Sequence, residues 1–327
     1  DEGHTLIFIS HKLDEVLAIA DDITVMRRGT TVATVDPQAV TARRLAELMV
    51  GSELPSPSTE ESTVTDRECL VLTGVTVRDH TGRDVLSDIN LTIRAGEVLG
   101  IAGVEGNGQT ELVEALTGLR RLAAGRVLLE GRDLTNAPPR RLFGAGLSHV
   151  PEDRRKHGLV LTYPVADNLV LSSYHQRPFA DGLRLVREQV LRFARRVVRE
   201  FDIRTPSVQT PVQYLSGGNQ QKTVVGREFS RPMRLLIAAQ PTRGLDIGSI
   251  EFIHRRIIEA RDQGTAVLLV SAELDEVTAL ADRVAVLYRG RVAALRPADR
   301  FTREELGLLM AGAPATPEPG TPSERVD

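Results

Sequence analysis

The sequence predicts an α/β domain with a largely parallel sheet, preceded by a short segment that repeats the end of that domain. Short apolar runs with the length of buried strands alternate with helical patterns along the chain. A glycine-rich turn joins one of these strands to a helix, and residues 5–51 align with residues 266–312. Alternation of strands and helices favours parallel strands joined by right-handed crossovers.

Hydrophobic periodicity predicts the elements in order. The strongest helix covers residues 183–201, where arginines fill the face opposite the apolar one and are expected to be solvated. Its apolar face comprises Leu183, Val186, Val190, Phe193, Val197 and Phe201. The expected strands are 70–72, 89–93, 97–102, 235–239 and 266–270, and the other expected helices are 109–117, 250–262 and 275–281.

An internal repeat predicts the domain organisation. Residues 5–51 align with 266–312 at a constant offset of 261 without a gap, and 17 of the 47 positions are identical, where average composition gives about three. The apolar run 6–9 has the character of a buried strand. We therefore expect residues 1–51 to be the end of a truncated first domain, preceded in the intact protein by about 200 residues of the same kind.

The rest of the chain divides by composition. Residues 52–68 contain many Pro, Ser, Thr and Glu residues and are expected to form an exposed linker. Residues 69–312 are expected to form one complete domain. Residues 313–327 have the linker's composition and are expected to be a disordered tail.

Composition excludes several classes of protein. Of the 327 residues, 41% are hydrophobic and 26% charged, as in ordinary globular chains and unlike disordered or collagen-like ones. The single cysteine, Cys69, can form no internal disulfide and indicates a reducing compartment. No apolar run reaches the roughly 18–20 residues of a membrane-spanning helix, and no signal peptide opens the chain.

The charge balance argues against nucleic-acid binding. The net charge is −3 and only 4% of residues are aromatic, so neither a basic patch nor a stacking surface for bases is indicated. Three lysines among 41 basic residues leave 38 arginines, a bias that we attribute to a GC-rich genome.

Residues 103–110, Gly-Val-Glu-Gly-Asn-Gly-Gln-Thr, follow a predicted strand and precede a helix. A phosphate-binding loop of the form G-x-x-x-x-G-K-[ST] occurs in this context, because glycines let backbone N–H groups converge on an anion at a helix N-terminus. The spacing fits, but Gln109 replaces the lysine. The loop alone is equally compatible with a glycine-rich turn that binds nothing. The candidate nucleotide-binding residues here are Gly103, Gly106, Asn107, Gly108, Gln109 and Thr110.

A second motif distinguishes between these alternatives. Residues 215–222, Leu-Ser-Gly-Gly-Asn-Gln-Gln-Lys, lie roughly a hundred residues after the loop and shortly before Leu-Leu-Ile-Ala-Ala-Gln-Pro-Thr-Arg-Gly-Leu-Asp at 235–246. With these motifs in this order, residues 5–51 and 69–312 resemble the ATPase subunits of bacterial ATP-binding cassette (ABC) importers for sugars and nucleosides, which carry two fused nucleotide-binding domains.

The resemblance implies a P-loop NTPase-type domain with a mostly parallel sheet, an antiparallel β part and a helical subdomain at about 160–231. It also implies ATP and Mg²⁺ as ligands, and a signature that closes over ATP held by the opposite domain. Ser216 can cap the following helix while Gly217 and Gly218 expose N–H groups. The residues expected to face the partner's ATP are Ser216, Gly217, Gly218 and Gln220.

The domain's own ATP site departs from the family pattern. The strand ending at Ala239 and Gln240 normally ends in Asp-Glu, so Ala239 cannot hold Mg²⁺ and Gln240 is no general base, a role worth about 10²–10⁴-fold in rate. A glutamine can still orient water, so a trace rate remains possible. The family's switch histidine is His11 in the first copy, whereas the second copy has Ala272. These replacements predict a degenerate site that binds Mg²⁺ weakly.

Three further positions have two interpretations each. Glu152 replaces the glutamine of the family's glutamine loop and, with Thr110, could contact Mg²⁺, or it could belong to a solvated turn. Asp246 corresponds to the loop that communicates between ATP sites, or it is a helix N-cap. His80 is the only candidate for stacking on adenine, although a surface histidine is the favoured interpretation.

These expectations lead to a functional prediction. The chain is expected to belong to an ATP-hydrolysing subunit at the cytoplasmic face of the inner membrane, bound to permease subunits and acting indirectly with a periplasmic or lipoprotein solute-binding protein. The missing N-terminal domain or a second copy would complete the dimer, and the chain alone should be nearly inactive. Residues 238–244 favour nucleosides over simple sugars. The alternatives are a nucleotide-free module for dimerisation and permease docking and, less favoured, a soluble cassette ATPase.

Overall fold

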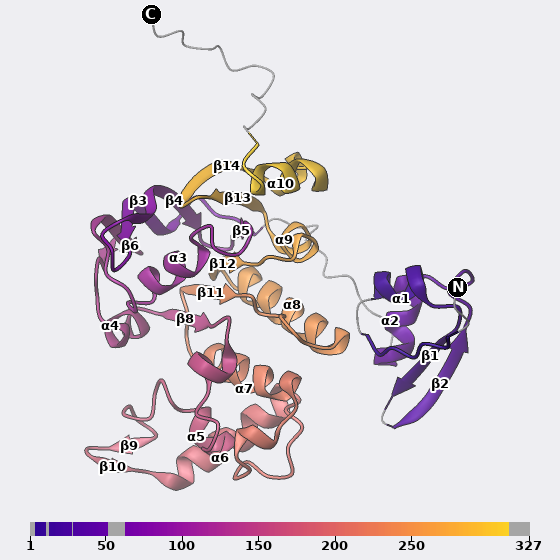
Figure 1. Cartoon of the computed structure of the whole chain (residues 1–327). Helices are drawn as coiled ribbons and strands as arrows, with labels where there is room; N and C mark the ends of the chain where they lie inside the picture. Colours follow the sequence, from indigo (N-terminus) through magenta and orange to yellow (C-terminus); the bar gives the residue numbers. More distant parts are fainter. Residues whose placement is uncertain (1–3, 11–12, 28, 52–62, 314–327) are drawn as a thin grey trace, which may run out of the picture. The chain divides into compact units, whose positions relative to one another are not determined.

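The computed structural model describes residues 4–10, 13–27, 29–51 and 63–313. The chain divides into two compact units, one of residues 1–58 with 242–256 and the other of residues 59–241 with 257–327. Figure 1 labels their helices and strands.

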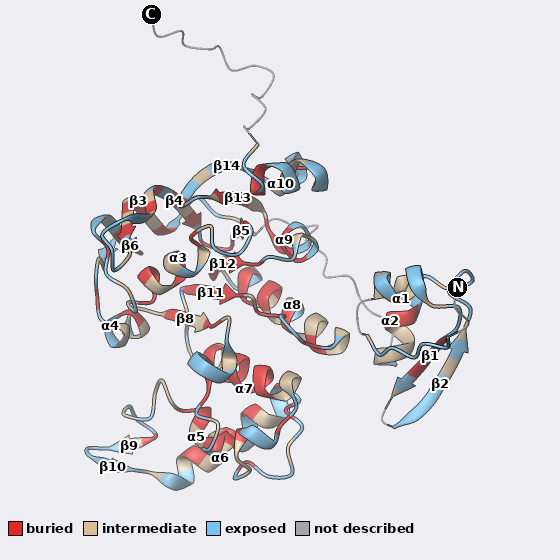
Figure 2. Ribbon diagram, in the orientation of Figure 1, coloured by how far each residue is buried: buried red, intermediate tan, exposed pale blue. Residues whose placement is uncertain are grey.

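A six-stranded sheet organises the larger unit, with the strand order β14-β13-β5-β12-β11-β8. Its first five strands in sequence are parallel and its last pairs antiparallel with β13. Every residue of β5, β11 and β12 is buried (Figure 2), as in parallel sheets covered on both faces. The predicted parallel α/β sheet is confirmed. The strands are β5 (Val98–Ala102), β8 (Leu147–Val150), β11 (Leu235–Ala239), β12 (Ala266–Val270), β13 (Arg283–Tyr288) and β14 (Arg291–Pro297).

A second, antiparallel sheet has the order β4-β3-β6-β7. Its inner face joins one hydrophobic core with the parallel sheet and with the helix α3, so that Leu70 and Ile89 share a cluster with Leu99 and Leu112. This packing fixes the glycine-rich loop, because the loop connects β5 to α3. The elements are β3 (Glu68–Arg78), β4 (Asp84–Arg94), β6 (Ala124–Leu129), β7 (Arg132–Asp133) and α3 (Gln109–Leu116).

Helices and a small hairpin form a subdomain at the other side of this unit from the antiparallel sheet (Figure 1). They occupy the predicted region 160–231. The elements are α5 (Val165–Asn168), β9 (Ala180–Asp181), β10 (Arg184–Leu185), α6 (Arg187–Glu200) and α7 (Gly217–Phe229).

The start of the predicted helix 183–201 was wrong. Asp181 pairs with Arg184, so Gly182 and Leu183 make the turn of the β9–β10 hairpin. Gly182 has φ +62°, a conformation that glycine adopts readily. Leu183 is fully exposed instead of facing the core. The rest of the predicted apolar face is confirmed, since Val190 and Val197 are buried on α6, and the arginines opposite them are exposed.

The remaining predicted helices occur with small shifts at their ends. The 250–262 helix begins three residues earlier and the 275–281 helix one residue earlier. Besides α3, the α-helices of residues 63–313 outside the subdomain are α4 (Pro139–Gly144), α8 (Ile247–Asp262), α9 (Leu274–Leu280) and α10 (Arg303–Met310).

The α-helices and strands of residues 13–50 reproduce those of residues 274–310 one by one. Each first-copy helix begins 261 residues before its counterpart, and both hairpins carry an irregularity at the same position, after Val25 and after Val286. Thr41 and Thr302 each cap a helix by accepting the N–H three residues later. The first-copy elements are α1 (Leu13–Ile19), β1 (Ile23–Arg27), β2 (Thr30–Val35) and α2 (Ala42–Val50).

The predicted buried strand at residues 6–9 was wrong for the described chain. Residues 4–10 have no regular structure, and Leu6, Ile7 and Ile9 are exposed. Their counterpart β12 pairs with β11 on one side and β5 on the other. Among the described residues, no first-copy equivalent of β11 or β5 offers these bonds, and an apolar run alone cannot form a strand without neighbours.

The described part of the linker is ordered against the larger unit. The Thr63 hydroxyl donates to the Gly96 carbonyl at 3.0 Å, and the Thr65 N–H donates to the Ala95 carbonyl at 3.0 Å. The linker prediction for residues 52–62 and the disorder prediction for 314–327 lie outside the described residues.

Candidate nucleotide site

The loop between β5 and α3 depends on two glycines for different reasons. Gly106 has φ +92° and a Cβ there would meet no atom within 4 Å, so the backbone conformation alone favours glycine. Gly108 has φ +110°, and a Cβ there would lie 2.6 Å from Leu86 Cδ2. Close packing beneath the loop therefore holds the start of α3 against β4.

Asn107 anchors the loop instead of facing its hollow. Its side-chain Oδ1 accepts the Arg289 N–H at 2.9 Å, its carbonyl accepts the Gly290 N–H at 2.9 Å, and its own N–H donates to Val104. The turn between β13 and β14 thereby fixes the loop's shape. A ligand in the hollow would contact the remaining backbone groups.

Gln109 folds back into the loop. Its Nε2 donates to the Val104 carbonyl at 3.2 Å and lies where a Cβ on Gly103 would be only 2.3 Å away. Its Oε1 is buried and has no hydrogen-bond partner, although buried polar atoms are normally satisfied. The position of the missing lysine thus carries a neutral side chain with an unpaired acceptor.

A cavity of about 400 Å³ opens beside this loop, a volume in the range of small-molecule sites. It brings together six of the predicted site residues, whereas Asn107 and Gly108 do not line it. The six are Gly103, Gly106, Gln109, Thr110, Glu152 and Gln240.

The four replaced positions converge on this cavity. Gln109, Ala239 and Gln240 line it, and the Ala272 N–H donates to Gln240 Oε1 at 3.2 Å. Gln240 has φ +45°, an uncommon conformation for a residue with a side chain. The side-chain amide of Gln240 is therefore held by the backbone of Ala272, the residue that aligns with the family's switch histidine.

The opposite wall comes from the segment after β8 and contains residues that the sequence argument missed. Asp153 caps η1 (Arg154–Gly158), its Oδ1 accepting the N–H groups of Arg155 and Lys156 at 2.9 and 3.0 Å. These bonds lower the Asp153 pKa, that from Lys156 most strongly. Lys156 and His157 then line the cavity beside Glu152. Two features of the sequence could have pointed to them: both residues lie close to Glu152, and lysine is rare in this chain.

His149 at the end of β8 separates this cavity from a larger groove, lining both. Burial lowers the pKa of His149 to about 4; the Glu228 carboxylate opposes this shift and Arg227 adds to it. Its imidazole is therefore neutral near pH 7 and contributes no positive charge to either space.

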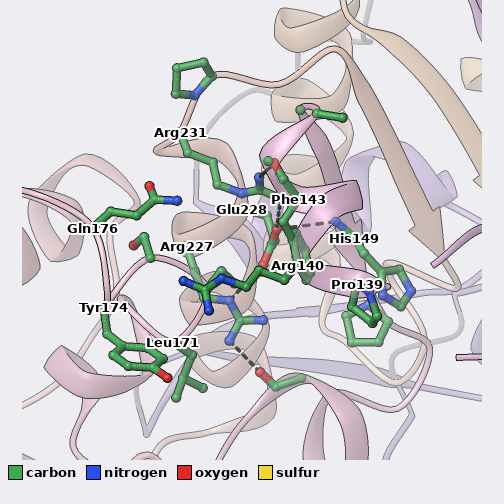
Figure 3. A pocket seen from close by; sticks show the side chains of 18 of the residues that line it. Pro139, Arg140, Phe143, His149, Leu171, Tyr174, Gln176, Arg227, Glu228 and Arg231 are labelled. Atoms are coloured by element: carbon green, nitrogen blue, oxygen red, sulfur yellow. Dashed lines mark hydrogen bonds and ion pairs between the residues drawn. The ribbon is translucent and has the colours of Figure 1, made fainter. Parts of the chain in front are cut away.

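The groove has a volume of about 990 Å³ and is walled by α4, η1, the segment after α5 and the end of α7 (Figure 3). Glu228 lies at its base between two arginines. Its Oε1 accepts from Arg227 Nε at 2.8 Å, and its Oε2 accepts from Arg231 at 2.9 Å. The His149 N–H donates to Glu228 Oε2 at 3.4 Å, and Arg231 Nη1 donates to the Phe143 carbonyl at 3.3 Å. The same residues thereby connect α7 to β8 and α4.

The signature occupies the start of α7. The Ser216 Oγ accepts from Asn219 Nδ2 at 2.9 Å and caps the helix, as predicted. Gln220, in contrast, is buried and donates to the Val212 carbonyl at 3.1 Å. Ser216, Gly217 and Gly218 are thus the predicted signature residues that remain accessible at the helix N-terminus.

Three other predicted positions are not among the residues that line the cavity. Asp246 accepts from the N–H and hydroxyl of Ser249 at 3.0 and 2.8 Å, which is the geometry of a helix N-cap. His80 is exposed in the β3–β4 turn and does not line the cavity. His11 lies outside the described residues.

The described residues lack two kinds of feature. No helix among them is long and apolar enough to cross a membrane. No group of three or more His, Cys, Asp or Glu side chains among them is arranged to hold a metal ion.

Comparisons with known proteins agree with this geometry. A family model described as ABC transporter matches residues 86–243. The chain is 46% identical to the guanosine import ATP-binding protein NupO of Bacillus subtilis and 43% identical to the nucleoside import ATP-binding protein NupA of Lactococcus lactis. It is 42% identical to the glucose import ATP-binding protein of Haloferax volcanii. These alignments cover 95% of this chain but 61%, 62% and 57% of the relatives, so the chain spans about three fifths of their length.

Solved structures match the fold. The ATP-binding subunit of an ABC transporter superposes with a TM-score of 0.62 at 21% identity, over 74% of this chain and 99% of the other. A nucleotide-free ATP-binding cassette from an ABC transporter gives a TM-score of 0.60 at 21% identity, over 70% of this chain and 91% of the other. The predicted ABC ATPase fold, with parallel and antiparallel sheets, is confirmed.

Proposed function

Because residues 86–243 match the ABC transporter family model and the fold is that of an ABC ATPase, we propose that the chain is part of an ATP-binding subunit that energises import of a small polar solute. In this proposal its own site binds ATP without turning it over, and its signature completes the ATP site of a second domain. Hydrolysis belongs to the assembled transporter.

The convergence of the replaced positions carries the proposal. Gln109, Ala239 and Gln240 meet at one cavity, and Ala272 is hydrogen-bonded to Gln240. One site thus lacks the family's lysine, its metal-binding aspartate, its general base and its switch histidine. The helix cap that Ser216 makes in the signature is intact. A domain with this combination can assist another site and cannot complete its own.

The site still suits a nucleotide. The loop keeps glycines in conformations that a phosphate cradle uses, with φ +92° at Gly106 and +110° at Gly108. Thr110 and Glu152 line the cavity and would hold Mg²⁺, whose preferred ligands are oxygens. Ala239 offers no carboxylate, so we expect weak Mg²⁺ binding, and Gln240 can at most orient water.

The partner of this site would be a first nucleotide-binding domain or a second copy of the chain. The matched hairpins and helix caps of the two segments support descent from one domain, as does the greater length of the relatives. The exposed apolar run at 6–9 fits a strand whose neighbours belong to the rest of a first domain. Residues 1–51 would then end that domain, with His11 as its sensor.

A permease is the second proposed partner. The groove between the parallel-sheet core and the helical subdomain is large and is lined by Tyr174, Phe143 and Leu171 (Figure 3). Such a groove can receive a helix of a membrane subunit. Docking there would place the chain at the cytoplasmic face of the inner membrane, with the solute-binding protein on the other side.

Nucleosides are the favoured solutes. Two of the relatives named above import guanosine or nucleosides, and the third imports glucose. The residue pattern at 238–244 also resembles that of nucleoside importers more than that of simple-sugar importers. Simple sugars remain the second class.

The alternative, a nucleotide-free module for dimerisation and docking, is favoured by the cavity's charge. Glu105, Glu114, Glu152 and Asp153 all line it, and carboxylates repel phosphates. Nucleotide occupancy distinguishes the two proposals, whereas loss of the signature would impair transport in both.

We predict that calorimetric titration of the chain with ATP gives micromolar binding that changes by less than about threefold when Mg²⁺ is removed, because Ala239 provides no metal support. Gly106→Val should abolish it, since a β-branched residue is strained at this φ. Gly131→Val is the matched control: Gly131 has φ +72° and equally open surroundings but lies in the β6–β7 turn. No binding at millimolar ATP would favour the nucleotide-free module.

A further inference from the structure

The cavity has an unbalanced charge for an anionic ligand. Four carboxylates line it, of which Glu114 is paired with Arg120 at 2.7 Å. Gln109 contributes no charge where the family has a lysine. Backbone N–H groups alone carry only partial charges, so a triphosphate bound here requires a cation from elsewhere in the wall.

The wall offers few candidates. Among its described residues, the basic side chains are His149, Lys156 and His157. His149 is neutral near pH 7, because its pKa is about 4. The permanent positive charge in this wall is therefore the Lys156 ammonium.

We propose that Lys156 supplies the phosphate-neutralising charge that the loop lacks at Gln109. The phosphate-binding lysine of this site would thus lie on η1, across the cavity from α3. The family's lysine would instead lie at the start of α3, where this chain has Gln109. This inference rests on the proposed nucleotide site and names a phosphate-binding residue within it.

The local structure holds Lys156 in place for this role. The Asp153 carboxylate caps η1 through the Arg155 and Lys156 N–H groups, which fixes the turn relative to the end of β8. Arg155 is exposed on the same turn and lines neither the cavity nor the groove. Of the two neighbouring cationic side chains on this turn, Lys156 lines the cavity and Arg155 does not.

The Lys156 ammonium is also available. The other lysine in the described chain, Lys222, is nearly buried and donates to Asp202 at 3.0 Å. Lys156 is exposed, and no ion pair or side-chain hydrogen bond of its ammonium occurs within the described chain. A compact ammonium on a flexible stem can follow phosphate oxygens as a point charge with three donors.

The position of Lys156 has a second consequence. Lys156 lines the groove as well as the cavity, so a phosphate contact there would act on the wall that the two spaces share. Nucleotide binding and occupancy of the groove would then influence each other through η1.

The test compares ATP affinity among Lys156→Met, Arg155→Met and the unaltered chain by calorimetry at one fixed salt concentration. We expect Lys156→Met to weaken ATP binding at least tenfold, in line with a charge-assisted contact, and Arg155→Met to change it less than twofold. Adding Gln109→Lys to Lys156→Met should recover at least half of the lost binding free energy, because charge returns to the family position.

The outcomes separate the two proposals. If the unaltered chain binds ATP and Lys156→Met binds equally well, the role of Lys156 is overturned while the nucleotide site stands. Equal weakening by Arg155→Met would also overturn it, by showing a general effect of surface charge. Absence of ATP binding to the unaltered chain would overturn both.

Discussion

In the transporter that we propose, Gly217→Asp should lower transport-coupled ATP hydrolysis at least 100-fold. Gly217 is the first residue of α7, where backbone N–H groups are exposed and the helix dipole favours an anion. A fixed carboxylate there would repel the phosphates of the opposite site. Loss of one such stabilising group typically costs about 10²–10³ in rate.

Two comparisons make this expectation specific. Gly217→Asn has nearly the same shape without the charge and should cost no more than about tenfold. An aspartate in the first turn favours helix formation, so a large loss in Gly217→Asp would not reflect unfolding. Gln240→Ala should stay within about twofold of the unaltered transporter, because we propose that hydrolysis occurs at the opposite site. A Gln240→Ala loss as large as that of Gly217→Asp would contradict the assignment.

The largest expected effect on stability is that of Glu228→Gln. The Glu228 side chain is only 1% exposed and accepts from Arg227 and Arg231. Burial tends to raise its pKa, but the two guanidinium groups outweigh this effect and lower it, so the carboxylate is charged. Removing one partner of a buried ion pair costs about 3–5 kcal/mol, because the other charges remain buried without compensation.

Equilibrium urea unfolding of the chain measures this loss. The matched control is Glu188→Gln on α6, where Glu188 is paired with Arg192 at 2.7 Å but 80% exposed. Exposed pairs of this kind contribute about 0–1 kcal/mol. A Glu228→Gln loss below 1 kcal/mol, or one equal to that of Glu188→Gln, would show that the Arg227–Glu228–Arg231 network does not hold the helical subdomain to β8.

The buried strands of the larger unit were predicted best. The predicted bounds of β11 and β12 coincide with the observed ones, because a short, wholly apolar run fits only a strand covered on both faces. Residues 6–9 have the same character but are exposed. The difference lies in the neighbours, since a central strand requires partners that local composition does not reveal.

The cavity was predicted in part. The loop residues and Glu152 came from motif spacing, and the cavity brings them together. Lys156 was missed because its contribution depends on the turn that Asp153 caps, and a motif does not specify which side of a turn faces a cavity. Gln220 was assigned to a partner's ATP by its position in the signature, whereas helical geometry turns its amide toward Val212.

Identifying the bound nucleotide tests the central claim most directly. The chain is incubated with ATP and Mg²⁺, separated from free nucleotide, and its bound nucleotide is analysed over time. Retention without turnover predicts that bound nucleotide is recovered as ATP, with ADP forming at least 100-fold more slowly than a transporter-typical rate on the order of 1 s⁻¹. Recovery as ADP at about that rate would contradict the claim, because Gln240 and Ala239 would then support catalysis.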